Sequence, residues 1–512
     1  MILASGRKQH LAIQESRRLP EWSGRILILA IIGIAFLTLF PFRFSFHSSQ
    51  REVLSPFLLQ SGMKSAGLLD DFLNVLLFVP FGFGLAGELS ARGTRRVASL
   101  LSCLVAGALV SYGVEFLQNF IPSRDAGWHD VMTNSTGSVV GFVFFAFTGE
   151  RVLRYLHGME AAISDFVTFR RAVWIGSLYF GAWLLFSVPL QQHARIANWD
   201  PNALLTVGNF AAGKQDTAWK GQVSRLELWD RSTPNDLAEE ITSGKLANQP
   251  LANLIGSYDF SAALPLKDGT GHLPDLTWNI AAIAAKTAPG TFDGQAWLIS
   301  AAPAPLLAKR FAETNQFSLH LVCTPDSINE PSGRILTISR GPASVNLDVK
   351  QEGRDLVFWF RNRLAIRRST LAWNVSDVFE PRLARNILIS FDGDRLSLFV
   401  DGRRESNAYL IGPAAVLAHF LRSIKTSELE AYNYVYYALI FFLGGIIVGI
   451  AVRNPGPGRY WNILSLGVAF LIPSGLLEAV LMHAADRPLS YASIALGVCL
   501  TAGGALWINA DV

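Results

Sequence analysis

Hydrophobic residues gather in eight stretches that contain no charged side chain. A helix needs about 20 mainly apolar residues to cross a bilayer, and most of these stretches approach that length. We therefore predict about eight membrane spans, at 26–42, 72–87, 97–114, 131–149, 172–192, 431–452, 460–477 and 488–510.

The long segment between the fifth and sixth stretches, residues 193–425, has a different pattern in which polar and apolar residues alternate. Turn dipeptides of the Asp-Gly type, such as Asp392-Gly393 and Asp401-Gly402, separate short alternating runs, which is typical of antiparallel strands joined by tight turns. The predicted strands are 344–350, 356–360, 387–391 and 396–400. Short strands at this spacing indicate an all-β sandwich.

Composition agrees with a membrane protein that carries a polar domain. Of the 512 residues 50% are hydrophobic and only 16% are charged, against about 25% charged in soluble domains. This excludes a disordered, fibrous or disulfide-stapled protein, and the net charge of +4 is too small to indicate nucleic acid as a partner. The three cysteines, Cys103, Cys323 and Cys499, provide no disulfide framework, and we expect Cys323 to be buried in a strand.

Basic residues predict the orientation, because they favour the cytoplasmic side. Most of them lie before the first span and in alternate short loops, for example Arg25, Arg95, Arg154 and Arg453. We expect a bacterial cytoplasmic membrane protein with both termini inside and a retained first span. The predicted fold is a multi-pass α-helical bundle with an inserted extracytoplasmic β-sandwich, divided into 1–24 (N-terminal segment), 25–192 (five spans), 193–425 (β-sandwich) and 426–512 (three spans).

Polar residues occur at helical spacing near one end of three predicted spans. A carboxylate facing lipid costs at least roughly 2.5–3.5 kcal/mol near the bilayer centre, so we expect these side chains to face one another in a polar pocket at the outer leaflet. Glycines let neighbouring helices approach closely. The predicted pocket residues are Asp71, Asn74, Glu115, Gln118, Arg124, Asp130 and Asn134, and the predicted packing residues are Gly82, Gly137 and Gly141.

A structural interpretation competes with this one. The cluster would then only hold the helices together, and Asp70, Asp71, His129 and Asp130 would mark the membrane surface. No second histidine stands at ligand spacing from His129, so we predict no metal and no cofactor.

The motifs around these residues resemble the VanZ-like membrane family. They are Asp70-Asp-Phe-Leu-Asn-Val-Leu-Leu-Phe-Val-Pro-Phe-Gly-Phe-Gly84, Glu115-Phe-Leu-Gln-Asn-Phe-Ile-Pro-Ser-Arg124 and His129-Asp-Val-Met-Thr-Asn-Ser-Thr-Gly-Ser-Val-Val-Gly141. The resemblance covers roughly residues 25–150 and implies that Asn74, Pro80, Gly82, Glu115, Gln118, Arg124, Asp130, Asn134 and Gly137 are characteristic positions. The family is named for an accessory protein linked to teicoplanin resistance and has no settled reaction. The resemblance therefore implies a location in the membrane and no particular mechanism.

The last three predicted spans contain a segment that is similar to the second of these motifs. Ser474-Gly-Leu-Leu-Glu478 is similar to Ser111-Tyr-Gly-Val-Glu115, and Arg487 follows Glu478 by nine residues, as Arg124 follows Glu115. Leu481 stands in the place of Gln118, and Ser493 in that of Asp130. Either the C-terminal spans are a decayed internal repeat, or the likeness arises because short helical hairpins tend to end in charges.

The β region resembles a laminin-G-like, concanavalin A-type jelly roll. Leu254-Ile-Gly-Ser-Tyr-Asp-Phe-Ser261 is similar to the opening of that fold, and 386–403 is similar to its late hairpin. The usual ending stands too early, at 219–231. We therefore expect a circularly permuted sandwich in which 200–245 completes sheets built from 253–412; the alternative is a fragment of a second module. The hypothesis fails if 218–229 pairs with no strand from 253–412.

Domains of this type commonly bind glycans, through exposed aromatic residues. The candidates are Trp219, Trp229, Trp278, Trp297, Trp359 and Trp373, most of which we expect in the core. No pair of acids has a spacing that indicates a glycosidase, and Asp268, Asp392 and Asp401 fit turns better than calcium.

Three functions remain open from the sequence. The first, which we favour, is a non-enzymatic envelope protein whose pocket engages a membrane lipid or a lipid-linked precursor, with a lectin-like domain that binds surface polysaccharide or protein. The second is an enzyme that acts on a lipid head group, with Glu115 as general base and Arg124 holding a phosphate. The third is a structural partner of a polysaccharide export or protein-sorting complex.

Overall fold

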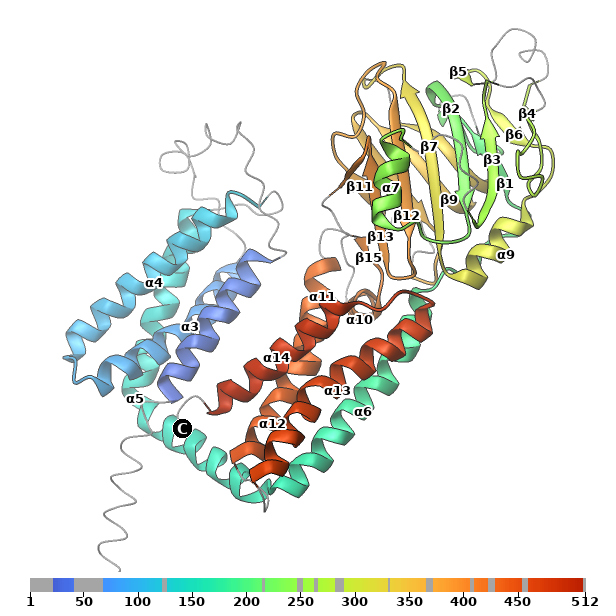
Figure 1. Ribbon diagram of the computed structural model, residues 1–512. Helices are drawn as coiled ribbons and strands as arrows, with labels where there is room; N and C mark the ends of the chain where they lie inside the picture. Colours follow the sequence, from blue (N-terminus) through green and yellow to red (C-terminus); the bar gives the residue numbers. More distant parts are fainter. Residues whose placement is uncertain are drawn as a thin grey trace, which may run out of the picture. The chain divides into compact units, whose positions relative to one another are not determined.

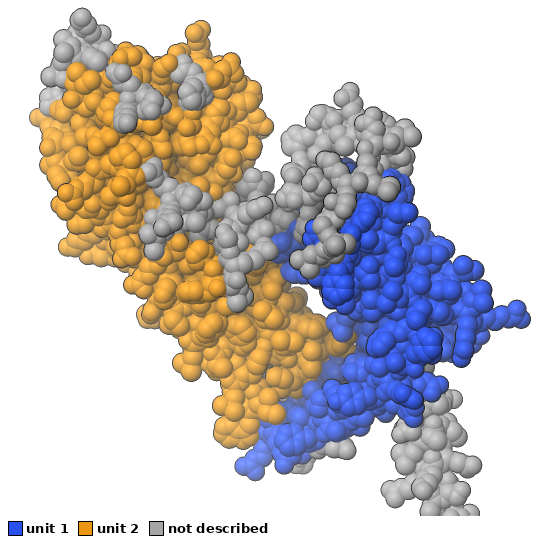
Figure 2. Space-filling model, turned by 180° about the vertical axis from the view of Figure 1, so that it is seen from behind, with its two compact units in different colours: residues 1–173, 449–457, 508–512 blue, residues 174–448, 458–507 orange. Residues whose placement is uncertain are grey.

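The computed structural model divides the chain into two compact units, which Figure 2 shows in two colours. Unit 1 comprises Met1–Val173, Gly449–Pro457 and Ile508–Val512, and unit 2 comprises Trp174–Val448 and Gly458–Trp507. The structure describes residues 22–40, 68–121, 127–213, 217–245, 252–261, 266–280, 290–329, 332–364, 372–405, 409–421, 429–453 and 459–509.

The membrane part consists of long apolar helices (Figure 1). They are Trp22–Leu39, α3 (Leu68–Ala91), α4 (Arg96–Gln118), α5 (Trp128–Phe166), α6 (Phe169–Ala194), α11 (Leu429–Tyr437) continuing through η4 (Ala438–Phe442) into α12 (Leu443–Arg453), α13 (Arg459–Ala485) and α14 (Tyr491–Asn509). Seven of the described helices are long and apolar enough to cross a membrane, and Leu471–Ala485 in α13 is a shorter apolar helix. The predicted fold class is confirmed, with about seven spans in place of eight.

Glycines bring α3 and α5 into backbone contact in unit 1. A Cβ atom built on Gly82 would lie 1.9 Å from the carbonyl oxygen of Ser138, and one built on Gly141 would lie 2.2 Å from that of Val79. A Cβ on Gly137 would lie 2.2 Å from the carbonyl oxygen of Val75. These distances leave no room for a side chain, so all three predicted packing glycines lie where the two helices touch.

Unit 2 repeats these contacts between α12 and α14. A Cβ on Gly445 would lie 2.1 Å from the carbonyl oxygen of Thr501, and one on Gly504 would lie 2.1 Å from that of Phe442. Gly445 and Thr501 stand 363 positions after Gly82 and Ser138. Gly504 and Phe442 likewise stand 363 positions after Gly141 and Val79. The same spacing in two independent contacts supports the internal repeat.

The repeat extends to the helix that precedes each group. A Cβ atom built on Gly84 of α3 would lie 2.9 Å from the Cβ of Leu27 in the first helix, and one built on Gly176 of α6 would lie 3.7 Å from Ile447 of α12. Ile447 stands 363 positions after Gly84, so α6 is the counterpart of the first helix. We call helix Trp22–Leu39 with α3, α4 and α5 the first module, and α6 with α11–α12, α13 and α14 the second module. The β-sandwich is inserted after the first helix of the second module.

The glycine contacts predict the effect of adding one methyl group. We expect Gly141→Ala and Gly504→Ala each to lower the free energy of unfolding by about 1–3 kcal/mol, the cost of overpacking a close-packed contact. Unfolding in mixed detergent micelles, followed by circular dichroism, measures the change. Gly113→Ala in α4 is the matched control, because none of the described atoms outside its own helix backbone lies within 4 Å of a Cβ built there. Equal stability of all three variants would contradict the packing role.

Two antiparallel sheets form the β region, as a sandwich-like pair (Figure 1). One sheet has the order β11-β10-β9-β8-β1-β6-β4, and the other has the order β14-β13-β12-β7-β2-β3, with β15 paired to β13 and β5 paired to β2. The strands are β1 (Leu204–Val207), β2 (Lys220–Trp229), β3 (Leu254–Asp259), β4 (Leu276–Trp278), β5 (Thr291–Asp293), β6 (Leu298–Ser300), β7 (Phe317–Pro325), β8 (Gly333–Gly341), β9 (Ser344–Glu352), β10 (Asp355–Phe360), β11 (Trp373–Val375), β12 (Arg385–Phe391), β13 (Arg395–Val400), β14 (Arg403–Arg404) and β15 (Tyr409–Leu410).

Three short helices complete this region. Helix α7 (Asn235–Thr242) packs Ala238 and Ile241 against Leu388 and Phe399 of β12 and β13, and Figure 1 shows it lying over that sheet. Helix α9 (Pro305–Thr314) lies between β6 and β7 in the sequence, and α10 (Pro413–Leu421) follows β15. The strands predicted at 344–350, 356–360, 387–391 and 396–400 are present as β9, β10, β12 and β13.

Strand β2 decides between the two interpretations of segment 200–245. It pairs with β7, from Gly221 opposite Pro325 to Trp229 opposite Ser318, and on its other side with β3. Strand β1 likewise pairs with β8 and β6. The early segment therefore completes both sheets, as the permuted arrangement requires.

Most aromatic residues of the sandwich form its core. Phe317 contacts the rings of Phe358, Phe360 and Phe391 between the sheets. The six tryptophans that were candidates for sugar contact are at most 7% exposed: Trp219, Trp229, Trp278, Trp297, Trp359 and Trp373. Burial of these rings agrees with the expectation that most of them belong to the core, and it removes all six as candidates for sugar contact.

The three aspartates that the sequence assigns to turns accept hydrogen bonds or form an ion pair within the fold. Asp268 accepts hydrogen bonds from the backbone of Ser257, Thr270, His272 and Leu273. Asp392 accepts from the backbone of Asp394 and Arg395, and Asp401 pairs with Arg385 at 2.7 Å. Their oxygens are used within the fold, as the turn interpretation predicts.

Cys323 provides a test of both burial and membrane orientation. The residue is 1% exposed in β7, and burial raises the pKa of its thiol to about 12. The thiolate, which is the reactive form, is therefore scarce at pH 8. We expect a maleimide reagent to label Cys323 only after unfolding, as judged against a Cys323→Ser variant. In sealed vesicles of known sidedness, labelling by an impermeant reagent from the cytoplasmic side alone would overturn the predicted orientation.

Candidate functional site

Four polar residues meet where α3 and α5 begin. The Asn74 amide donates to the Asp130 carboxylate at 2.8 Å, and His129 Nδ1 lies 3.2 Å from Asp71 Oδ1. The side chains of His129 and Asp71 are 25% and 26% exposed. We call these residues the polar cluster. Asp71 and Asp130 lie in the first turns of their helices, where a carboxylate is stabilised by the helix dipole.

Glu115 has a separate partner. Its side chain is buried, with the residue 2% exposed, and its Oε2 accepts a hydrogen bond from the backbone N–H of Gly127 at 2.8 Å. Gly127 immediately precedes α5. Since the first amides of a helix have no partner within the helix, Glu115 ties the end of α4 to the start of α5.

The remaining predicted residues make contacts of their own. The Gln118 amide donates to the Thr38 carbonyl at 2.9 Å, at the end of the first helix. The Asn134 amide donates to the Ser111 hydroxyl at 2.8 Å inside the α4–α5 interface. Arg124 lies outside the described residues. The structure thus brings Asp71, Asn74 and Asp130 together, and it places Gln118, Asn134 and Glu115 in three distinct helix-to-helix contacts.

The second module repeats the Glu115 contact. Glu478 Oε1 accepts from the backbone N–H of Ser490 at 2.9 Å, twelve residues further on, just as Gly127 follows Glu115. The Arg487 guanidinium also lies 2.7 Å from Glu478. Glu478 stands 363 positions after Glu115, the spacing of the glycine contacts. Both modules therefore share the glycine contacts and the bond from the buried glutamate, and we call these shared contacts the frame of a module.

The polar cluster is absent from the second module. At the same spacing of 363, the counterparts of Asp71, Asn74, Gln118, His129, Asp130 and Asn134 are Tyr434, Tyr437, Leu481, Ala492, Ser493 and Gly497. No acidic or histidine side chain remains among them. The frame of glycines and glutamate forms without the cluster, so the packing of a module does not require it.

A second ionic group in unit 1 was not predicted. Glu160, near the end of α5, pairs with Arg453 at 2.8 Å and with Arg25 at 3.3 Å, and it accepts from the Trp22 indole at 2.9 Å. Glu160 follows Asp130 by 30 residues, about 45 Å along a helix, which exceeds the roughly 30 Å of the hydrocarbon core. No sequence periodicity links Glu160 to partners so far away in the chain. Its position beyond the end of a predicted span was the one sign that this glutamate could meet basic residues at the membrane surface.

The comparisons with known proteins identify one region. Residues 27–149 match the model of the family described as VanZ/LLP1. This region is a VanZ-like domain. It contains the polar cluster, the glycine contacts of α3 and α5, and Glu115. The comparisons with curated proteins and with solved structures found no match.

The contacts of Glu115 predict which substitutions the VanZ-like domain tolerates. Glu115→Gln keeps an oxygen that can accept from Gly127, so we expect a change in unfolding free energy below about 1 kcal/mol. Glu115→Ala leaves a buried amide without its acceptor, which costs about 1–3 kcal/mol. Unfolding in detergent measures both. A stable Glu115→Gln protein that has lost its envelope phenotype would contradict a structural role and indicate chemistry at this carboxylate.

Proposed function

We propose that the VanZ-like domain binds the polar head of an amphiphilic or lipid-linked envelope component through the polar cluster. The observation that carries this proposal is the difference between the modules. Both have the buried glutamate and the glycines at the positions of Gly82 and Gly141, but only the first has Asp71, Asn74, His129 and Asp130. Polar residues at the ends of membrane helices that the fold does not need are expected to have a function.

The chemistry of the cluster favours one kind of head group. Carboxylates accept hydrogen bonds, and Asn74 and His129 can donate them. Asp70 adds a further acidic residue to the first turn of α3. Such a group repels a bare phosphate at close range and attracts hydroxyl and amino groups. A lipid-linked saccharide, or another head group rich in hydroxyls, therefore suits the site better than a simple phosphate ester.

The enzymatic alternative finds less support. A general base must reach the proton that it removes, but Glu115 is 2% exposed and its carboxylate is engaged by Gly127. We therefore favour binding without catalysis. The arrangement of charges supports the proposed orientation: the group of Arg25, Arg453 and Glu160 would lie on the cytoplasmic side, with the polar cluster at the opposite face.

The β-sandwich would then lie outside the cell and bind surface polysaccharide or a protein. Since the six candidate tryptophans are buried, we expect any sugar contacts to come from loops and not from these rings. The inserted position of the sandwich supports this role, because both of its ends return to the same module.

Binding to a lipid-linked saccharide tests the proposal. Full-length protein in lipid nanodiscs is incubated with a radiolabelled polyprenyl-linked saccharide, and retention on the protein is measured. We expect Asp71→Asn combined with Asp130→Asn to raise the dissociation constant about tenfold, a change of about 1.4 kcal/mol. The matched control is Ser493→Ala, at the counterpart of Asp130 in the second module, which should bind normally.

Three results would count against the proposal. Unchanged binding by the double variant, with binding lost on deletion of 193–425, would assign recognition to the sandwich. A chemically altered head group recovered from the wild-type protein would show catalysis. Failure of the wild type to retain the saccharide, with normal thermal stability, would favour a purely structural partner of an envelope complex.

A further inference from the structure

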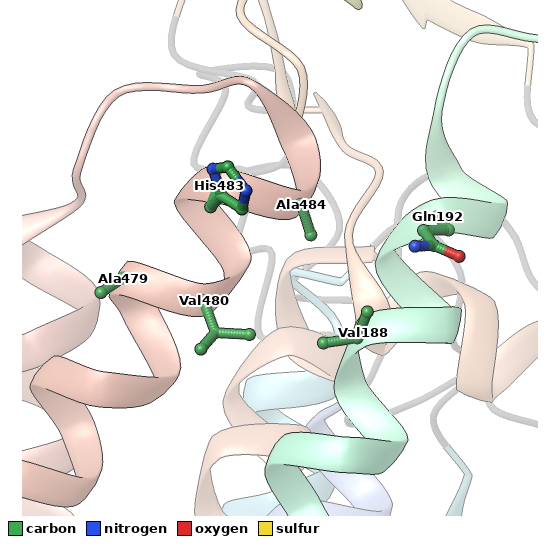
Figure 3. Close-up of a pocket in the computed structure, with 6 residues that line it drawn as sticks. All are labelled: Val188, Gln192, Ala479, Val480, His483 and Ala484. Atoms are coloured by element: carbon green, nitrogen blue, oxygen red, sulfur yellow. The ribbon is translucent and has the colours of Figure 1, made fainter.

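A groove of about 450 Å³ opens between α6 and α13 in unit 2. It is lined by Val188, Gln192, Ala479, Val480, His483 and Ala484, and Figure 3 shows Val188 and Val480 pointing toward each other from the two helices. Its size falls in the range of small-molecule sites, about 300–1,000 Å³.

The first module has large apolar side chains at three of the corresponding positions. At the spacing of 363, Ala479, His483 and Ala484 correspond to Phe116, Phe120 and Ile121. The rings of Phe116 and Phe120 contact each other at 5.4 Å, and Ile121 is 1% exposed. At these three positions the second module has smaller or polar residues, which leaves more room beside α13 than the first module's residues would.

The opposite wall changes in the same way. Gly176 of α6 stands 149 positions after Leu27 of the first helix, and at this spacing Ser187 corresponds to Thr38 and Val188 to Leu39. Leu39 and Ile121 belong to one buried cluster of the first module. In the second module, Val188 is smaller than Leu39 and Ala484 is smaller than Ile121, and neither Val188 nor Ala484 is buried.

The surface around the groove is apolar. Leu185 of α6 is 79% exposed, and Leu471, Ile472 and Leu476 of α13 are 46–59% exposed. Both helices are apolar in composition, so acyl chains of a membrane would contact this face. A hydrocarbon chain is the occupant that this surface already meets.

Polar groups lie at one end of the groove. Gln192 and His483 stand two residues before the ends of α6 and α13, and both are exposed. The Arg195 guanidinium donates to the carbonyl of Ala484 at 2.9 Å and lies 3.6 Å from the carboxylate of Asp486. Asp486 is 55% exposed, so water weakens this ion pair, and Arg195 can also interact with an anionic group.

We propose that this groove binds an alkyl chain linked to a phosphate group, with the chain between Val188 and Val480 and the phosphate near Gln192, His483 and Arg195. The site differs from the polar cluster in module, in residues and in the charge that it favours. The occupant that this membrane-facing apolar surface favours is a bilayer phospholipid, and binding of a polyprenyl phosphate carrier in its place is an outcome that the test distinguishes.

Photolabelling in nanodiscs tests the groove. Full-length protein is reconstituted in phosphatidylethanolamine and phosphatidylglycerol with a trace of phosphatidylglycerol that carries a diazirine in its acyl chain; a second sample contains a diazirine-bearing polyprenyl phosphate. After irradiation, peptide mass spectrometry locates the label. We expect the phosphatidylglycerol probe to label the region around Val188 and Val480, and label there from the polyprenyl phosphate probe alone would overturn the assignment to a bilayer phospholipid.

Variants that fill the groove provide the control. Ala484→Ile and His483→Phe restore the kinds of residue that the first module has, and we expect about tenfold less label at Val188 and Val480. Leu476→Phe adds similar bulk at an exposed position outside the groove lining and should leave the label unchanged. Because His483 is exposed, we expect His483→Phe to fold normally. If Ala484→Ile lowers stability, the label measured with His483→Phe alone tests whether filling the groove excludes the ligand.

Two further outcomes would overturn the proposal. One is label spread evenly over the exposed positions of α6 and α13, as for annular lipid, and the other is groove label that the filling variants do not reduce. Asp71→Asn combined with Asp130→Asn should leave this label unchanged. Failure of the groove proposal and failure of the proposed function are therefore distinguishable.

Discussion

The close approach of helix backbones at glycine is the contact on which the membrane part depends. Lipid offers little hydrophobic drive for helix association, so spans associate through close packing and polar contacts. Gly82 and Gly141 allow α3 and α5 to touch, and this contact fixes the start of α5 beside α3. Asn74 can reach Asp130 only because the two helices lie so close. The buried Glu115 then holds α4 to the start of α5, which completes the frame of the module.

Sequence patterns predicted the elements well, because length and periodicity are local properties. The apolar stretches and the alternating runs mark helices and strands, and the helical spacing of polar residues grouped Asn74 with Asp130, which share a hydrogen bond. Partners that depend on tertiary contact were not predictable. Gln118 donates to a backbone carbonyl of Thr38, and every residue has such a carbonyl, so no side-chain pattern indicates this bond. The tryptophans show the same limit, since indole rings serve cores and surfaces alike.

The two modules use one frame for different purposes. The first keeps a polar cluster at the beginning of α3 and α5, whereas the second places tyrosine, serine and glycine there. The second instead supports the β-sandwich at the corresponding end. The Asn315 amide donates to the carbonyl of Ala485 at 2.7 Å, Gln316 donates to the carbonyl of Asp486, and Arg487 lies 3.9 Å from Asp394. Where the first module presents polar side chains, the second holds a domain.

The contacts of Arg487 have a mechanical consequence. This nearly buried guanidinium lies between Glu478 of α13 and Asp394 of a turn in the sandwich, close to the point where α13 passes into α14. Because α6 and α11 lead into and out of the sandwich, a force applied to the sandwich would reach the membrane helices at three places and not through one flexible tether. Such a force would therefore strain the second module first, and the hairpin of α13 and α14 would carry much of that load.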